Sequence, residues 1–93
     1  MDINAIADKI RERMAGSGFD RSVLIDLKGE GTILVDGAEV TVGGGEADCT
    51  IRVSKDDFAE IASGALDPTQ AFMTGKMSID GDMGAAMALG RAL

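Results

Sequence analysis

Few residues of this chain could carry out chemistry, and their setting favours structural roles. Histidine, the commonest general base and metal ligand, is absent. The single cysteine, Cys49, falls on the apolar side of an alternating pattern, whereas a reactive thiol needs an electropositive, partly exposed setting. We therefore expect Cys49 to be a small core residue. Because no other nucleophile stands at a useful spacing from a base, the sequence predicts no catalytic residue and no enzymatic activity.

Neighbouring carboxylates are the next candidates. Asp56 and Asp57 stand where a helix is expected to begin, and the helix dipole stabilises acidic side chains there. Asp80 and Asp82 flank Gly81 in an expected turn, without the further oxygen ligands that calcium would need. We interpret both pairs as cap and turn residues. The sequence thus predicts no metal and no cofactor.

Two other patterns could bind a charged partner. Gly43-Gly44-Gly45 lacks the lysine and helix start of a phosphate-binding loop, so a hairpin connection is the favoured interpretation. Lys9, Arg11 and Arg13 give the first helix a basic patch. A solvated helix face is the favoured interpretation, and docking to an acidic partner or lipid headgroup is the alternative.

Composition narrows the class of protein. The 93 residues are 45 % hydrophobic and 27 % charged, which predicts one domain spanning residues 1–93. The net charge of −7 argues against nucleic-acid binding, which depends on Lys and Arg. No apolar run reaches the ~18 residues of a membrane span, and no secretory signal pattern is present. With a single cysteine there is also no reason to expect an oxidising compartment, so we expect a cytoplasmic location.

Periodicity predicts the elements of the first half. Asp2 can cap a helix whose apolar residues fall on one face, namely Ile3, Ile6, Ala7, Ile10 and Met14. Four strand-like runs follow at residues 23–27, 33–35, 40–42 and 49–53. Because glycine turns join them at short intervals, they indicate an antiparallel meander with one face covered.

The second half changes period and is mainly helical. Its predicted elements are a helix from Ser54 to Gly64, a helix from Asp67 to Gly75, a strand at 77–79, and a helix from Asp82 to near Leu93. The fifth strand follows a two-helix crossover, so it could pair in parallel with an earlier strand. Since helices and strands are segregated, the predicted class is α+β with a mainly antiparallel sheet.

The last helix has an unusual composition. From Met83 to Gly90 no side chain is charged or forms hydrogen bonds, and Met83 and Met87 share one face. A helix that is apolar all round must be buried on most sides or face another apolar body. We therefore expect a neighbouring subunit, a lipid or a cavity ligand to complete its surroundings.

Residues 47–90 resemble the sterol carrier protein type two family in residue type and spacing. The residues that carry the resemblance are Ala47-Asp48-Cys49-Thr50-Ile51, Ser54 with Asp57-Phe58, Gly64, Asp67-Pro68, Ala71-Phe72 with Gly75-Lys76, and Ile79-x-Gly81-Asp82-Met83-Gly84 with Ala86-Met87. The first half agrees with the family only in its pattern of a helix followed by a meander.

The resemblance implies a five-stranded sheet covered by helices, with an apolar tunnel between the sheet and the C-terminal helices. It also implies a carrier of fatty acids, fatty acyl-CoA, phospholipids or sterols rather than a catalyst. Carried onto this sequence, the residues expected to line the tunnel are Phe58, Ile61, Phe72, Met73, Met77, Ile79, Met83 and Met87.

Two functional hypotheses follow. The leading one is a lipid-binding carrier whose partner is an apolar small molecule, with no nucleic acid and no stable membrane insertion. The alternative is a protein-interaction module, or a subunit, with the same fold and a filled core. In both, the C-terminal helix is the segment expected to make any transient contact with a membrane or a protein.

Overall fold

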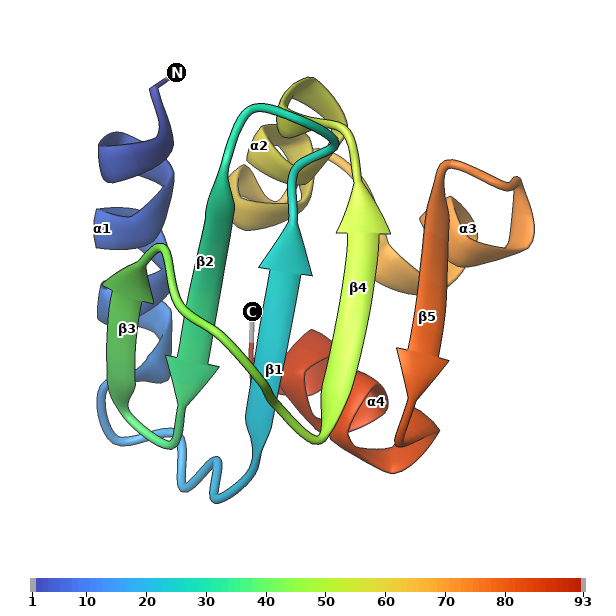
Figure 1. Cartoon of the computed structure of the whole chain (residues 1–93). Helices are drawn as coiled ribbons and strands as arrows, with labels where there is room; N and C mark the ends of the chain where they lie inside the picture. The colour runs from blue at the N-terminus through green and yellow to red at the C-terminus, as the bar shows by residue number, and fades with distance from the viewer. Residues whose placement is uncertain (1, 93) are drawn as a thin grey trace.

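One face of a five-stranded sheet is covered by helices in the computed structural model, which describes residues 2–92 (Figure 1). The elements follow the order α1 (Ile3–Met14), β1 (Ser22–Asp26), β2 (Thr32–Asp36), β3 (Glu39–Val42), β4 (Cys49–Val53), α2 (Lys55–Ser63), α3 (Pro68–Met73), β5 (Met77–Gly81) and α4 (Met83–Ala92). The predicted α+β class and each predicted element are confirmed, with bounds shifted by a few residues. Within the described residues, no helix is both long enough and apolar enough to cross a membrane.

The strand order is β3-β2-β1-β4-β5, which differs from the predicted four-strand meander. Strands β1 to β3 do form an antiparallel meander, but β4 lies beside β1 and runs parallel to it, with Ile25 opposite Ile51. Strand β5 pairs antiparallel with β4, so the parallel pairing suggested for the last strand was wrong. The sheet is therefore mostly antiparallel, with one parallel pair.

The connection over residues 43–48 explains this order. It crosses the face of the sheet that the helices leave uncovered, from the end of β3 to the start of β4 (Figure 1). Three strand spacings amount to about 14 Å, which is within the reach of six residues at roughly 3.3 Å each. The loop passes close to the sheet at Gly44, where a Cβ would lie 2.9 Å from the Leu34 Cβ.

Alternating side chains place the core on the helical side. The strand residues that are buried there are Val23, Ile25, Ile33, Val35, Val40, Cys49, Ile51, Val53 and Met77. Helix α1 adds Ile6, Ile10 and Met14 to the same core, and Asp2 caps its start by accepting a hydrogen bond from the Ala5 N–H. The expectation that Cys49 is a core residue is confirmed.

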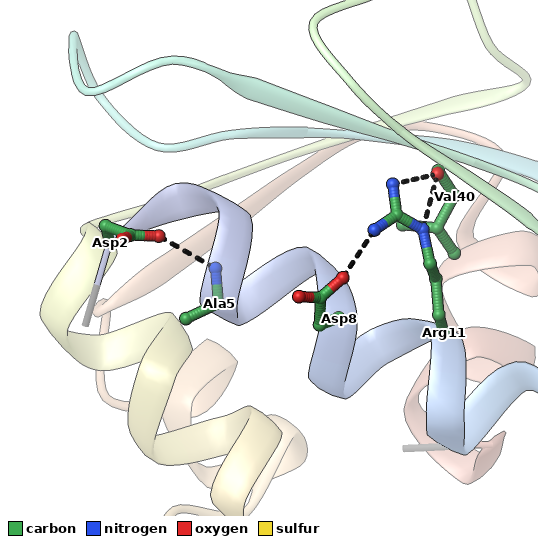
Figure 2. A network of polar contacts seen from close by, with 5 residues as sticks. All are labelled: Asp2, Ala5, Asp8, Arg11 and Val40. Atoms are coloured by element: carbon green, nitrogen blue, oxygen red, sulfur yellow. Dashed lines mark hydrogen bonds and ion pairs between the residues drawn. The ribbon is translucent and has the colours of Figure 1, made fainter.

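Arg11 attaches α1 to the edge strand β3 (Figure 2). Its Nε and Nη2 donate to the Val40 carbonyl oxygen at 3.0 and 2.8 Å, and its Nη1 donates to Asp8 at 2.6 Å. Because this guanidinium already holds two structural partners, Arg11 belongs to the scaffold, and the predicted basic patch of α1 contains one cation fewer than its sequence suggests.

Gly81 provides a test of the close approach between β5 and the start of β4. Its φ is +102°, and a Cβ there would lie 2.7 Å from the Asp48 carbonyl oxygen and 3.2 Å from the Cys49 Cα. Backbone strain and steric overlap together predict that Gly81→Ala lowers the free energy of unfolding by about 2–4 kcal/mol. Urea unfolding followed by circular dichroism would measure this loss.

Gly45→Ala is the matched control, because a Cβ at Gly45 meets no atom within 4 Å. Its free energy of unfolding should stay within about 0.5 kcal/mol of the parent protein. Equal effects of the two substitutions would contradict the tight packing inferred at Gly81.

Candidate functional site

Capping residues position the two helices that follow β4. The Ser54 hydroxyl oxygen accepts a hydrogen bond from the Asp57 N–H at 3.1 Å, and α2 ends at Gly64 in a left-handed conformation. Asp67 caps α3 by accepting from the Thr69 N–H at 2.9 Å. These caps agree with the sequence prediction and fix where the short helix α3 begins relative to α2.

Asp82 positions α4. One carboxylate oxygen accepts from the Gly84 N–H at 2.8 Å, as expected for a cap. The other pairs with Arg21 Nη1 at 2.9 Å, which ties the start of α4 to the segment before β1. Since both side chains are about half exposed, we assign the ion pair at most about 1 kcal/mol. Its main effect is to fix the direction in which α4 leaves β5.

The small side chains of α4, rather than its methionines, pack against the core. Ala85, Ala86 and Leu89 are buried, whereas Met83 and Met87 are 45 % and 48 % exposed. Helical periodicity places these two groups on different faces of α4. The surroundings of this apolar helix are therefore incomplete on its methionine side, as its composition predicted.

A hollow of about 440 Å³ lies next to that methionine face. Its lining residues come from β4 and β5 (Ile51, Met77, Ile79), from α2 (Phe58, Ile61), from α3 and its cap (Asp67, Pro68, Thr69, Phe72), and from α4 (Met83, Ala86, Met87, Leu89, Gly90, Arg91). We call this hollow the α3–α4 groove. Apolar side chains form nearly all of its wall.

The α3–α4 groove is open to solvent, in contrast to the internal tunnel that the sequence led us to expect. Phe72, Met83 and Met87 line it and remain 41–48 % exposed. Among residues 2–92, no element covers these three side chains completely.

Seven of the eight predicted lining residues meet in this groove, namely Phe58, Ile61, Phe72, Met77, Ile79, Met83 and Met87. The eighth, Met73, is absent from the lining and is 77 % exposed. Met73 is the last residue of α3, and its side chain lies mostly in solvent. The structure thus places Met73 outside the groove that the other seven residues line.

Several lining residues were not among those predicted from the sequence. Ile51 lies on the helix-facing side of the β4 alternation, and Ala86 and Leu89 belong to the uncharged last helix. These sequence patterns could have predicted all three as lining residues. No sequence pattern indicated that Thr69 and Arg91 line the groove, because only the packing of α3 against α4 brings them there.

Comparison with known proteins agrees with this architecture. Residues 4–93 match the SCP-2 sterol transfer family. The chain belongs to that family. Human sterol carrier protein 2 is 36 % identical over 73 residues, which cover 77 % of this chain and 12 % of the human protein. The chain thus spans only a small part of the length of this curated relative.

Two solved structures from Aedes aegypti share the fold. The crystal structure of sterol carrier protein 2 like 2 has a TM-score of 0.81 at 20 % identity and covers 98 % of this chain and 95 % of its own. The solution structure of palmitated SCP2L2 has a TM-score of 0.77 at 22 % identity, and the match covers 98 % of this chain and 93 % of that protein. The resemblance expected from residues 47–90 is therefore confirmed over nearly the whole chain. Membership of this family supports lipid or sterol binding and transfer.

Cys49 of this family member has the properties of an unreactive thiol. It is 1 % exposed at the start of β4. Burial raises the pKa of the Cys49 thiol, and the negative charges of Asp82 and Asp80 raise the pKa further. Both effects favour the neutral thiol over the nucleophilic thiolate.

This raised pKa predicts a pH dependence of stability. In the unfolded chain Cys49 ionises near its ordinary pKa of about 8.5, whereas the folded protein keeps it protonated to higher pH. The contribution of Cys49 to the free energy of unfolding is therefore fully present below the pKa of the unfolded chain. It is lost as the pH rises through the raised pKa of the folded protein. Urea unfolding between pH 7 and 9.5 should show this loss, and Cys49→Ala should show a smaller one. Equal pH dependence in both proteins would contradict the assignment.

Proposed function

We propose that this chain binds a lipid in the α3–α4 groove and carries it without chemical change. The observation that carries the proposal is a mostly apolar hollow of about 440 Å³, within the range of roughly 300–1,000 Å³ typical of small-molecule sites. Candidate ligands are a fatty acid, a fatty acyl-CoA, a phospholipid or a sterol. Because the related SCP2L2 of Aedes aegypti has been solved in palmitated form, we regard a fatty acyl chain as the first ligand to test.

The flexible rim of the groove suits ligands of different shape. Met83 and Met87 are unbranched and half-exposed, so they can change rotamer around an entering chain. Phe72 of α3 adds a flat apolar surface to the same groove. A lipid chain lying against these side chains removes apolar surface from water, at roughly 25 cal/mol per Å². This gain is the proposed driving force for binding.

A carrier role without catalysis fits the chemistry of the lining. Asp67 is the one carboxylate among the lining residues, and it caps α3 through the Thr69 N–H. The Cys49 thiol is not part of the lining, and its raised pKa disfavours the thiolate. We also propose a reducing compartment such as the cytoplasm, since Cys49 is a free thiol within the core.

Ligand binding should stabilise the fold. A ligand that binds only the folded chain raises the free energy of unfolding by about 2.7 kcal/mol at one hundred times its dissociation constant. Thermal unfolding with hexadecanoic acid, an acyl-CoA, a phospholipid and cholesterol would measure this shift, and native mass spectrometry would give the stoichiometry. The absence of a shift and of a bound mass with all four lipid classes would contradict the proposal.

The groove rim can be tested with two equivalent substitutions. Met87→Gln places a polar amide at the rim of the groove and should weaken fatty-acid binding about fivefold, because a half-exposed methionine contributes roughly 1 kcal/mol. Met73→Gln makes the same change on an exposed side chain outside the groove and should leave affinity unchanged. Fluorescence displacement titrations would give both affinities.

The same variants separate lipid binding from protein docking. If Met87→Gln abolished concentration-dependent self-association in sedimentation while lipid affinity stayed constant, the interaction-module hypothesis would be favoured. Equal weakening of lipid binding by both variants would contradict the assignment of the α3–α4 groove.

A further inference from the structure

Polar side chains line the α3–α4 groove at one end only. They are Asp67, Thr69 and Arg91, which belong to the start of α3 and the end of α4. These two helix ends meet, since a Cβ on Gly90 would lie 3.7 Å from the Pro68 Cβ. The groove therefore has a long apolar wall and a single polar end, which is the pattern of a site for an amphiphile.

Arg91 continues the methionine stripe of α4. Met83, Met87 and Arg91 are spaced four residues apart, so they lie on one side of the helix in successive turns, and all three line the groove. At 1.5 Å per residue, about 12 Å of helix separates Met83 from Arg91. One wall thus offers two apolar side chains followed by a guanidinium.

The charge of Arg91 is available to a ligand. Arg11, Arg21 and Arg52 each hold a carboxylate within 4.0 Å, whereas Arg91 has no such partner among residues 2–92. Asp67 lines the same end, but one of its oxygens accepts the Thr69 N–H, and no ion pair joins it to Arg91. Arg91 is therefore the lining residue that can donate charge-assisted hydrogen bonds to an anion.

We propose that Arg91 binds the carboxylate of a fatty acid whose hydrocarbon chain lies along the methionine face of α4. This inference rests on the proposed lipid-binding function and adds a head-group preference and an orientation to it. A guanidinium pairs with carboxylates and phosphates alike. A dianionic phosphate would feel both the attraction of Arg91 and the repulsion of Asp67 twice as strongly. It would also lose far more hydration on entering a mostly apolar groove, so the single-charged head group fits this end best.

The test compares ligands that differ only in the head group. Dodecanoic acid and dodecanol share one hydrocarbon chain, and dodecyl phosphate adds a more highly charged head. At pH 8 and low salt, we expect the parent protein to bind the acid about five- to tenfold more tightly than the alcohol, and more tightly than the phosphate. Because Arg91 is exposed, added salt should reduce this preference.

Variants assign the preference to one side chain. Arg91→Met should abolish the preference for the acid, measured as the ratio of the acid and alcohol affinities in this variant, and continued binding of the alcohol would show that the groove is still formed. Arg91→Lys should restore part of the preference. Lys76→Met removes an exposed cation that does not line the groove, and it should keep the full preference.

The outcomes separate this inference from the function on which it rests. Equal binding of acid and alcohol by the parent protein would overturn the role of Arg91 and leave the lipid site intact. A preference that survives in Arg91→Met would also overturn it, as would tighter binding of the phosphate. If none of the three ligands bound the parent protein, the proposed function would fail as well.

Discussion

Burial of one apolar face of the sheet is the constraint on which the rest of the structure depends. All five strands direct apolar side chains to the same side, and the helices cover that side (Figure 1). The opposite face is crossed by the connection from β3 to β4, which places β4 parallel to β1. After β4 the chain continues into α2, which packs against α1, and then into α3 and α4, which contact β5 and β4 where the groove lies.

The composition of α4 decides how that end is covered. Ala85 and Ala86 bring the helix close to the sheet, while Met83 and Met87 line the groove and stay half exposed. An enclosed empty cavity would cost about 24 cal/mol per Å³, whereas an open groove admits water and leaves apolar side chains exposed instead. The empty site therefore costs free energy because apolar side chains at its rim are exposed to water. A ligand lying there would cover these side chains and remove that cost.

Membership of the SCP-2 sterol transfer family agrees with this arrangement. The solved relatives share the fold at 20 % and 22 % identity, so the conserved property between them and this chain is the arrangement of elements rather than most side chains. In this chain the residues that line the groove include a methionine face on α4 and one arginine at its end.

The sequence by itself determined the elements, because caps such as Asp2, Ser54 and Asp67 and the apolar periodicities are local features. It also identified most of the groove, since family-like spacing selects residues such as Phe58 and Met77. Only the tertiary structure decided the pairing of β4 with β1, the exclusion of Met73, and the meeting of Thr69 with Arg91 at one end. These depend on how segments far apart in the chain pack together, which no local pattern encodes.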